Sequence, residues 1–400
     1  MIMNFSQMEL PPLVLQALND AGFSESTPIQ AKTIPIALKG NDIIGSAQTG
    51  TGKTLAFAIP AISKLLAVPT GTVLILAPTR ELAQQVHSSI KQLLAKIPKI
   101  NTALLIGGEN IFKQFGKLKI NPRVIVGTPG RVIDHLDRKT LKCDNIMLLV
   151  LDETDRMFDM GFSIQIEKII SQIPKKRQTL MFSATFPMKV EQLAAKYLIQ
   201  PQRISAGSDK PTVTKLKQEH INVIESEKYK KLLIQLQQRE GSIIVFVKTK
   251  INADRLASNL CKEMHKASAI HGDLRQHKRD RVMNDFRFGS FRIMVATDVA
   301  ARGLDVPHVQ HVINYDLPQD PEDYIHRVGR TARAGAEGSA LSFVSPQDGK
   351  KWFAIQRFMD PTANSNEKQI YFKANDNNRP QKNRKKFFDK KPGKWSKKSN

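Results

Sequence analysis

The chain of 400 residues has little cysteine and no long hydrophobic run. Cys143 and Cys261 are its only cysteines and lie far apart, which excludes a disulfide framework and a zinc site built from several cysteines. The start, "MIMNFSQMEL", lacks the basic and apolar segments of a signal peptide, and no apolar run approaches the roughly 18 residues that span a bilayer. We therefore expect a soluble cytoplasmic protein without a membrane partner.

Acidic residues are scarce relative to basic ones. The sequence holds 61 Lys and Arg against 37 Asp and Glu, a formal net charge of +24 at pH 7. A field of this sign attracts polyanions, nucleic acid before membrane. Ribosome-associated proteins are also basic, so composition favours a nucleic-acid partner without deciding the function.

Short apolar runs alternate with longer amphipathic segments in the first half of the chain. The runs contain few polar residues, which is typical of strands buried on both faces of a parallel sheet. We expect strands at 42–47, 72–78, 102–107, 123–129, 147–153 and 179–185. The helix expected between the second and third strands has one apolar face, formed by Leu82, Val86, Ile90, Leu94 and Ile97.

The alternation restarts after a polar stretch, so two α/β lobes are expected. In the second lobe the strands are predicted at 220–224, 242–247, 267–272, 292–298, 311–316 and 340–344. The last segment carries 12 Lys and Arg and 3 Asp and Glu, a net charge of +9, which is typical of a disordered tail. The predicted organisation is an N-terminal region (1–30), a first lobe (31–204), a short linker (205–218), a second lobe (219–360) and a basic disordered tail (361–400).

The stretch "AQTGTGKT" follows the first expected strand and precedes an apolar helix. This order is typical of a phosphate-binding loop, whose backbone N–H groups and helix N-terminus face the phosphates. Lys53 would reach the β- and γ-phosphates, and the hydroxyl of Thr54 would bind Mg²⁺. Ala47 stands where a first glycine is usual, and a chance turn rich in Gly and Thr is the alternative.

Two carboxylates follow the fifth expected strand, in "VLDETDRMFDMGF" (150–162). Behind a phosphate loop, Asp152 is expected to hold Mg²⁺ and Glu153 to orient or deprotonate the attacking water. An acidic pair taken alone would more often be a helix N-cap. The phosphate loop favours the catalytic interpretation, because a nucleotide site needs a second strand to complete its metal site.

Further short motifs stand in the order "GFSESTPIQ", "AQTGTGKT", "PTRELAQQ", "TPGR", "DETD", "SAT", "HGD", "ATDVAARGLDV" and "HRVGRTAR". With these motifs the chain resembles the DEAD-box RNA helicases of superfamily 2 over about residues 5–345. The resemblance implies two RecA-like lobes, with ATP and RNA bound across the cleft between them. In the acidic box the family usually has alanine as its third residue, and this chain has Thr154.

The resemblance implies an ATP site formed mainly by the first lobe. Gln30 would read the adenine edge, because an amide can pair with N6 and N7, and Phe23 or Phe5 would pack near the base. Gly303 and Asp305 of the second lobe would approach the γ-phosphate and the ribose. The phosphate loop would contribute Ala47, Gln48, Thr49, Gly50, Thr51, Gly52, Lys53 and Thr54.

The same resemblance places two arginines of the second lobe at the γ-phosphate. Arg330 and Arg333 in "HRVGRTAR" match these positions, and comparable arginine fingers raise rates roughly 10³–10⁵-fold. With Mg²⁺ as cofactor, the implied catalytic residues are Lys53, Asp152, Glu153, Arg330 and Arg333.

RNA would be bound through its sugar-phosphate backbone rather than its base edges. Glycines let phosphates approach the main chain, hydroxyls and arginines bind them, and contacts to the 2′-OH separate RNA from DNA. Plain turn geometry is the alternative for the glycines. The implied RNA-binding residues are Pro78, Thr79, Arg80, Gly107, Gly108, Thr128, Gly130, Arg131, Gln276, Arg279 and Thr297.

A last set would couple the lobes. Ser183 and Thr185 of "SAT" are placed to hydrogen-bond Asp155 or His326, and His326 and Arg327 would tie the lobes together. Each of these residues alone carries little signal, since small hydroxyl residues are common at strand ends.

The function implied by the resemblance is an ATP-dependent RNA helicase that separates short duplexes or remodels ribonucleoprotein. The alternatives are a DNA-stimulated superfamily 2 translocase and an RNA-binding or annealing protein with a weakened ATPase. The compact core and short tail resemble the bacterial RhlE type. Phe387, Phe388 and Trp395 alternate with lysines in the tail, which we expect to add RNA affinity. Ribosomal particles and the RNA-decay machinery are candidate partners.

Overall fold

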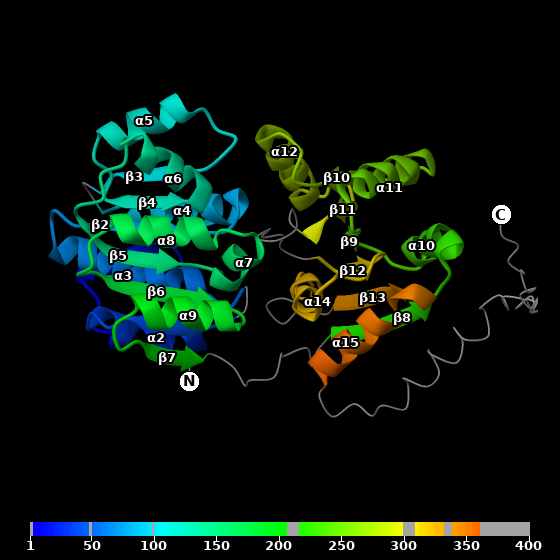
Figure 1. The fold of residues 1–400 in the computed structure, drawn as a ribbon, viewed down its shortest axis with the longest axis horizontal. Helices are drawn as coiled ribbons and strands as arrows, with labels where there is room; N and C mark the ends of the chain where they lie inside the picture. The colour runs from blue at the N-terminus through cyan, green and yellow to red at the C-terminus, as the bar shows by residue number, and fades with distance from the viewer. Residues whose placement is uncertain are drawn as a thin grey trace, which may run out of the picture.

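The computed structural model describes residues 3–47, 50–97, 100–205, 216–298, 309–331 and 338–360. Two parallel sheets, each with helices on both faces, form two lobes that lie side by side (Figure 1). This arrangement confirms the expected α/β fold with two RecA-like lobes. In the part of the chain that the structure describes, no helix is both long and apolar enough to cross a membrane.

The first sheet has seven strands in the order β3-β4-β2-β5-β6-β1-β7, all parallel where they pair. Six of them confirm the expected strands, and β7 is an edge strand that the apolar pattern did not indicate. The strands are β1 (Ile43–Ser46), β2 (Thr72–Leu76), β3 (Thr102–Leu105), β4 (Val124–Gly127), β5 (Ile146–Leu151), β6 (Gln178–Ser183) and β7 (Gln202–Ser205). The helices of this lobe are α1 (Pro12–Asp20), α2 (Pro28–Leu38), α3 (Lys53–Ala67), α4 (Arg80–Leu94), α5 (Ile111–Lys119), α6 (Pro129–Asp137), α7 (Thr154–Asp159), α8 (Ser163–Gln172) and α9 (Met188–Tyr197).

Successive residues of each central strand enter two different cores, which explains why the strand sequences are apolar throughout. Val73 and Ile75 of β2 pack with α2, α3 and α4, whereas Leu74 and Leu76 pack with α6, α8 and α9. Each such side chain stabilises the fold by roughly 1.5–3 kcal/mol when it is fully buried. Together the two cores make a rigid platform for the loops at the strand ends.

The second sheet has the order β10-β11-β9-β12-β13-β8, and its paired strands are also parallel. Ile244 and Phe246 of its central strand β9 face α12, α14 and α15, and Ile243 and Val245 face α10 and α11. The strands are β8 (Leu216–Asn222), β9 (Ile243–Phe246), β10 (Ala267–Ile270), β11 (Ile293–Ala296), β12 (His311–Asn314) and β13 (Gly338–Val344). The helices are α10 (Lys228–Gln237), α11 (Lys250–Lys262), α12 (Gln276–Arg287), α14 (Pro321–Val328) and α15 (Gly349–Met359).

Two predicted boundaries differ from the structure. The region 1–30 is not separate from the first lobe, because Phe5 and Val14 lie in the core of that lobe and α2 runs across residue 30. The predicted linker 205–218 is too long, because β7 extends to Ser205 and β8 begins at Leu216, where it pairs with β13. Residues 206–215 and the predicted tail 361–400 lie outside the described residues.

Most of the sequence motifs lie at the carboxyl ends of strands, where parallel sheets bind their ligands. Two do not, since "GFSESTPIQ" leads into α2 and "HRVGRTAR" begins in α14. In the first sheet, β1, β6 and β5 are neighbours and carry the phosphate loop, "SAT" and "DETD". Next to them, β2, β4 and β3 carry "PTRELAQQ", "TPGR" and the glycine pair. The strand order therefore places the residues predicted for ATP and for RNA in two adjacent groups.

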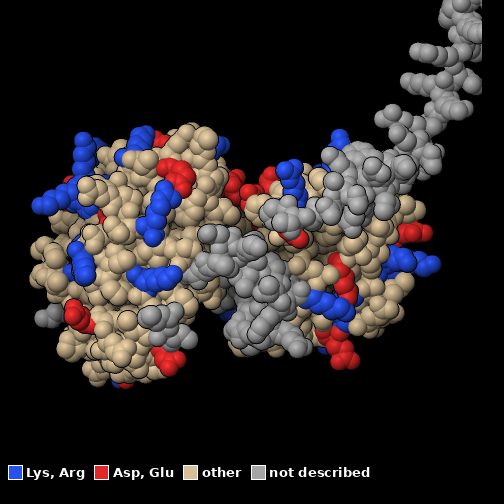
Figure 2. All heavy atoms as spheres, turned by 90° about the horizontal axis from the view of Figure 1, so that it is seen from below, with Lys and Arg blue, Asp and Glu red and all other residues tan. Residues whose placement is uncertain are grey.

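The charge of the described residues is distributed rather than concentrated on the face in Figure 2. On this face Lys and Arg side chains are interspersed with Asp and Glu on both lobes. Net charge alone therefore does not locate a nucleic-acid surface here, and the site has to be found from its geometry.

Candidate functional site

The phosphate loop joins β1 to α3 and is fastened to α2 by Gln30. Nε2 of Gln30 donates to the carbonyl of Gly52 over 2.9 Å, and its Oε1 accepts from the backbone N–H of Thr27, also over 2.9 Å. Gly52 has φ = 91°, and a Cβ on it would lie 2.5 Å from Nε2, so both the turn and this contact require glycine. The N-terminal helix thus sets the shape of the loop directly.

The two aromatic residues predicted near the nucleotide base differ in exposure. Phe5 is buried in the core of the first lobe, whereas Phe23 is 38% exposed. Phe23 is therefore the ring that a base can reach without rearrangement of the core. Of the other loop residues, Ala47 is buried, with its N–H donating to Ser183 O over 3.1 Å.

Lys53 and Asp152 face each other at the centre of the site. Lys53 is the first residue of α3, Asp152 follows β5, and Lys53 Nζ lies 3.8 Å from Asp152 Oδ1. Both atoms are buried, and neither has a hydrogen-bond partner among the residues that the structure describes. Such atoms are rare in folded proteins unless a ligand completes them. Thr54 follows Lys53 on α3 and is partly buried.

The two carboxylates of "DETD" differ in their electrostatics. Burial raises the pKa of Asp152 to about 6, with Lys53 opposing and Glu153 reinforcing that shift. Burial also acts on Glu153, but the positive charges of Arg156, Lys53 and Arg330 outweigh it and lower the pKa of Glu153 below its usual value. Glu153 is therefore ionised at neutral pH.

Arg156 is a buried arginine that contacts both lobes. Its Nη1 donates to Glu153 Oε2 over 2.7 Å, and its Nη2 donates to Nδ1 of His326 over 2.9 Å. Glu153 itself has φ = 50°, the left-handed conformation that costs energy for a residue with a side chain. The ion pair with Arg156 and the start of α7 hold it there. The helices that carry these residues, α7 and α14, face each other across the lobe boundary (Figure 1).

Of the two arginines predicted at the γ-phosphate, the structure describes Arg330. Arg330 is buried, its Nε donates to His326 O over 3.2 Å, and its charge acts on Glu153. It therefore lies on the correct side of the second lobe to face the acidic box. Five predicted residues of the nucleotide site lie outside the described residues, namely Gln48, Thr49, Gly303, Asp305 and Arg333.

Asp155 joins the acidic box to the "SAT" segment through several hydrogen bonds. Its Oδ2 accepts from the N–H of Ala184 (3.1 Å) and from the N–H (2.9 Å) and hydroxyl (3.1 Å) of Thr185. The N–H of Asp155 donates to Ser183 Oγ over 3.1 Å. Of the two partners predicted for Ser183 and Thr185, the structure places Asp155 in contact with both, and the imidazole ring of His326 accepts a hydrogen bond from Arg156.

Thr154 fills the unusual third position of the box with a fully buried side chain. Its hydroxyl lies 3.3 Å from Leu151 O and 3.2 Å from Phe182 O. A hydroxyl has one proton, so it bonds one carbonyl at a time or shares the proton between both. Thr154 thus adds a second connection between α7 and β6, beside the one that Asp155 makes.

Arg327 does not tie the lobes together as predicted. It is buried inside the second lobe, where Nε and Nη2 pair with the carboxylate of Asp298 at 2.6 and 2.7 Å. Nη1 donates to Asn314 Oδ1 and to Asp316 O, and the guanidinium lies over the ring of Phe246. These bonds use its donors within one lobe, so Arg327 is a structural residue that supports α14.

A groove of about 390 Å³ brings together most of the residues predicted to bind RNA. Its walls include Glu81, Met160, Phe162 and Gly272, which were not predicted. The predicted residues that line it are Pro78, Thr79, Arg80, Gly107, Thr128, Gly130, Arg131 and Arg279. The remaining predicted residue of the first lobe, Gly108, lies against Arg80, and Thr297 directly follows β11 and does not line the groove.

Arg80 lies at the point where the groove crosses between the lobes. Its Nη1 donates to Gln276 Oε1 of the second lobe over 3.3 Å. A Cβ on Gly108 would lie 2.5 Å from that same Nη1, so this glycine leaves room for the guanidinium. Burial lowers the pKa of Arg80, the charge of Glu81 opposes that shift, and the charges of Arg279 and Arg131 reinforce it. Three arginines close enough to repel one another form a site that favours an anion.

Glu81 connects the two lobes beside these arginines. Its Oε1 accepts from Nε of Arg279 over 2.7 Å and from Nε2 of Gln276 over 3.2 Å. Both Glu81 and Arg279 are about nine-tenths buried, which makes this a well-shielded ion pair. The pair forms the boundary between the groove and a second hollow.

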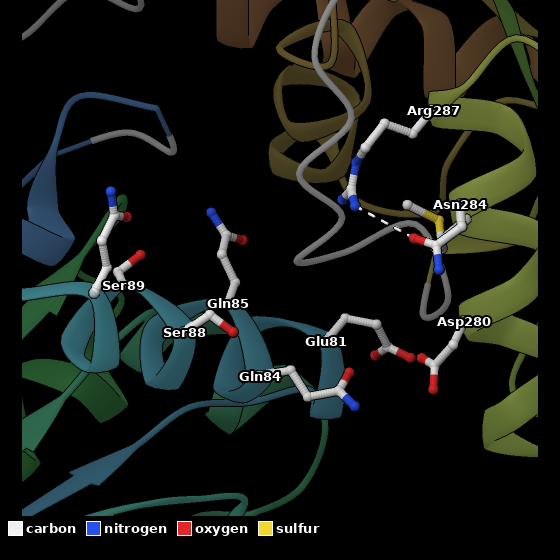
Figure 3. A pocket seen from close by; sticks show the side chains of 10 residues that line it. Glu81, Gln84, Gln85, Ser88, Ser89, Asp280, Asn284 and Arg287 are labelled. Atoms are coloured by element: carbon white, nitrogen blue, oxygen red, sulfur yellow. Dashed lines mark hydrogen bonds between the residues drawn. The ribbon is translucent and has the colours of Figure 1, made fainter. Parts of the chain in front are cut away.

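The second hollow, of about 510 Å³, lies between α4 and α12 and is lined by polar residues (Figure 3). Gln84, Gln85 and Ser88 of α4 face Asp280 and Asn284 of α12 across it. Most of these side chains are neutral amides and hydroxyls, so they suit hydrogen bonds to water or to a polar ligand rather than charge recognition.

Three charged residues belong to the site but were not predicted: Arg156, which is buried, Glu81, which is about nine-tenths buried, and Asp298, whose side chain is 26% exposed. Each stands inside or directly beside a quoted motif, in "DETDR", "PTRE" and "ATD". The sequence signal available was a charged residue close to apolar ones, because a charged side chain that becomes buried there requires a partner. The identity of that partner depends on tertiary contacts that the sequence does not indicate.

Comparisons with known proteins agree with this division into two lobes. Residues 27–193 match the family model described as "DEAD/DEAH box helicase", and residues 225–335 match "Helicase conserved C-terminal domain". The chain is 45% identical over 356 residues to the DEAD-box ATP-dependent RNA helicase CshA of Geobacillus kaustophilus, which covers 88% of this chain and 76% of the relative.

Solved structures of yeast proteins are also similar. Dbp5 of S. cerevisiae bound to RNA and ADP BeF3 superposes with a TM-score of 0.81 at 34% identity, covering 92% of this chain and 99% of that one. A Dbp5 variant bound to a Gle1 variant and IP6 gives a TM-score of 0.71 at 33% identity, covering 93% and 98%. The overall superposition on the first structure is therefore the better of the two.

Proposed function

Because the chain belongs to the DEAD-box family of ATP-dependent RNA helicases, we propose that it hydrolyses ATP when RNA is bound and thereby separates short duplexes or remodels ribonucleoprotein. The observation that carries this proposal is the buried pair of Lys53 Nζ and Asp152 Oδ1, which lie 3.8 Å apart. A phosphate oxygen would accept a hydrogen bond from the lysine and a divalent cation would bind the carboxylate, so ATP with such an ion would satisfy both groups.

The donor set fits Mg²⁺ held partly by the nucleotide. Asp152 and Thr54 offer oxygen atoms, which Mg²⁺ prefers, and the ion usually keeps several waters and phosphate ligands. Among the described residues there is no cluster of three or more His, Cys, Asp or Glu that could hold a metal without such help. When bound, the ion neutralises charge that develops on the phosphates.

Adenine recognition is proposed for Gln30 and Phe23. Gln30 already bonds Gly52 and Thr27, which fixes its amide plane and leaves one N–H and one lone pair for the base. The exposed ring of Phe23 would cover the base. Since Gln30 also holds the phosphate loop, binding of the base and shaping of the loop would be linked.

Water activation is proposed for Glu153. Its lowered pKa keeps it ionised, so it can accept a proton or a hydrogen bond from the attacking water at neutral pH. Arg330 faces it from the second lobe, and Arg333 would join it there to stabilise charge on the γ-phosphate. This assignment needs both lobes in contact, as they are at Arg156 and His326.

RNA is proposed to lie in the groove along its sugar-phosphate backbone. Thr79 and Thr128 offer hydroxyls, Gly130 offers an open main chain, and Arg131 and Arg279 offer guanidinium groups. Such groups position phosphates and carry little base preference, so binding would be independent of sequence. A contact to the 2′-OH would provide the preference for RNA.

ATP and RNA would assist each other's binding because each contacts both lobes. A ligand shifts a conformational equilibrium only by its differential affinity for the two states, and two ligands that favour the same closed state are positively coupled. Loss of the γ-phosphate on hydrolysis would remove one of the contacts that hold the lobes together, and the RNA would then be released.

The cellular role is a further proposal. The cytoplasm supplies both ATP and RNA, and the basic tail would tether the core to structured RNA, ribosomal particles or the RNA-decay machinery. Truncation after residue 360 should then raise the Michaelis constant for RNA and lower its salt dependence, and unchanged values would exclude the tether. Whether the chain is of the RhlE type stays a prediction.

A strand-displacement assay tests the proposed function. We expect ATP-dependent separation of a short RNA duplex, ATPase activity stimulated by RNA, and much weaker stimulation by DNA of the same sequence. Equal stimulation by DNA would indicate a DNA translocase instead. Tight RNA binding without ATP turnover would indicate an annealing protein.

A further inference from the structure

Helix α5 begins shortly after Gly108 and presents an exposed aromatic ring beside the groove. Phe112, in its first turn, is 73% exposed. The backbone around it is fixed, because Asn110 Oδ1 accepts from the N–H of Phe112 over 2.9 Å and Glu109 O accepts from Nη1 of Arg131 over 3.2 Å. Arg131 lines the groove, so one side chain joins the groove wall to the start of α5.

A series of aromatic contacts connects this exposed ring to the interior of the lobe. The ring of Phe112 meets that of Phe115 edge-on, with centroids 5.6 Å apart at 86°, and Phe115 meets His135 in the same way at 5.5 Å and 80°. His135 is buried and bonded to Gln114 at 3.0 Å, and Gln114 in turn donates to Ile106 O over 3.0 Å. Phe112 is therefore linked through Phe115 to the buried side chains between α5 and α6.

The exposed face of α5 around this ring is positively charged. Lys113, Lys117 and Lys119 are exposed, the helix has no acidic residue, and none of the three lysines forms an ion pair within the described part of the chain. Gly116 lies on this face between Phe112 and the lysines, and a Cβ on it would meet nothing within 4 Å. Glycine is a poor helix former, and no packing constraint requires it here.

We propose that α5 extends the RNA track, so that a nucleotide leaving the groove stacks its base on Phe112 while its phosphates pass Lys113 and Lys117. This proposal rests on the proposed function, since it needs RNA in the groove. The combination of an aromatic face with uncompensated positive charge suits single-stranded nucleic acid, whose bases all offer a face for stacking. An apolar protein partner would not need the lysines, and continuity with the groove through Arg131 favours RNA.

RNAs of two lengths distinguish binding to this surface from binding to the groove. Binding is measured by fluorescence anisotropy with single-stranded RNA of about 6 and about 14 nucleotides, with Mg²⁺ and AMP-PNP present. Phe112→Ala should weaken binding of the longer RNA roughly 5- to 100-fold and leave the shorter RNA within about twofold of wild type. Phe112→Trp keeps an aromatic ring and should bind both RNAs with affinities close to those of the wild type.

Two further variants control for folding and for a general loss of surface area. Phe288 is 83% exposed on the second lobe, and Phe288→Ala should change neither affinity. Gly116→Leu improves helix propensity but places a bulky side chain on the exposed face beside Phe112, so it should weaken only the longer RNA. Unchanged binding of both RNAs by Phe112→Ala, or equal weakening of both, would overturn the proposal. Failure of the wild-type protein to bind either RNA would instead overturn the proposed function.

Discussion

Arg156 in the first lobe donates a hydrogen bond to Nδ1 of His326 in the second lobe, over 2.9 Å. The same guanidinium pairs with Glu153 at 2.7 Å. One buried side chain thus joins the carboxylate proposed to activate water to the opposite lobe. Because Nδ1 of His326 accepts this bond, that nitrogen is unprotonated. The contact forms only when the two lobes are together, so closure of the lobes directly affects the position of Arg156 next to Glu153.

Replacing Arg156 should impair hydrolysis more than RNA binding. Arg156→Met removes the first of the positive charges that oppose the burial of Glu153, so the pKa of Glu153 should rise. We expect kcat for RNA-stimulated hydrolysis to fall about tenfold or more, a barrier change of at least about 1.4 kcal/mol. A carboxylate with a raised pKa acts as a base only at higher pH, so the remaining activity should increase as pH rises.

A double-mutant cycle separates the link between the lobes from a local effect on Glu153. Arg156→Gln and His326→Gln, alone and together, should be non-additive in kcat by at least about 0.5 kcal/mol if their contact matters for catalysis. Additive losses would mean that Arg156 acts through Glu153 alone. Circular dichroism of each variant controls for folding, since breaking a buried ion pair is itself destabilising.

Thr154 is expected to affect stability more than rate. Its hydroxyl bonds backbone carbonyls of β5 and β6 and no catalytic group. Thr154→Ala, the residue usual in the family, should lower the free energy of unfolding by about 1–2 kcal/mol and change the ATPase by less than about tenfold. Thr154→Ser should behave like wild type in both measurements. A larger rate loss in the alanine variant, restored in the serine variant, would show that the hydroxyl takes part in the site.

The ion pair of Glu81 and Arg279 should couple RNA binding to lobe closure. The two side chains are shielded from solvent and 2.7 Å apart, so removing either one leaves the other charge buried. Glu81→Gln and Arg279→Gln should each weaken RNA binding in the presence of AMP-PNP. Their effects should be non-additive by more than about 0.5 kcal/mol. Without nucleotide, when closure is not favoured, the interaction energy should be close to zero.

Two histidines of the first lobe should make it sensitive to acid. Burial, followed by the charges of Lys91 and Lys117, lowers the pKa of His87 to about 4, and burial followed by Arg131 lowers that of His135 to about 4. The folded state therefore binds fewer protons than the unfolded state between the unfolded pKa of about 6.5 and the folded value.

The stability of the first lobe should accordingly be highest above pH 6.5 and decrease as pH falls toward 4. In that window each histidine contributes a slope of up to about 1.4 kcal/mol per pH unit. NMR titration should show both imidazole rings protonated only near pH 4. Titration of either ring near pH 6.5 would contradict its burial in a neutral form.

The fold could be predicted from the sequence because the apolar pattern is strong. All twelve expected strands are present, since V/I/L-rich runs between amphipathic segments leave few other solutions. Strand β7 was missed because "QRIS" has only Ile204 as a buried residue, so an edge strand with exposed neighbours shows no apolar run. The start of β8, "LKQ" (216–218), was assigned to the linker for the same reason, since it shows no apolar run.

The site was predictable as far as its motifs reach and no further. Local spacing placed Lys53 and Asp152 on neighbouring parts of one sheet edge, where the structure also has them. It could not show that Arg327 would pair with Asp298 in its own lobe, or that Arg156 would reach His326. Those contacts depend on the positions of α7 and α14 relative to one another, which no single motif encodes.

The most direct test compares RNA-stimulated ATP turnover by the wild-type protein and Glu153→Gln. The amide keeps the size of the side chain but cannot take a proton from water, while the groove and the Lys53–Asp152 pair remain intact. We expect turnover to fall roughly 10²-fold or more, in the range for loss of a general base, with RNA affinity in AMP-PNP unchanged. Equal turnover by the two proteins would contradict the assignment of this site as the centre of hydrolysis.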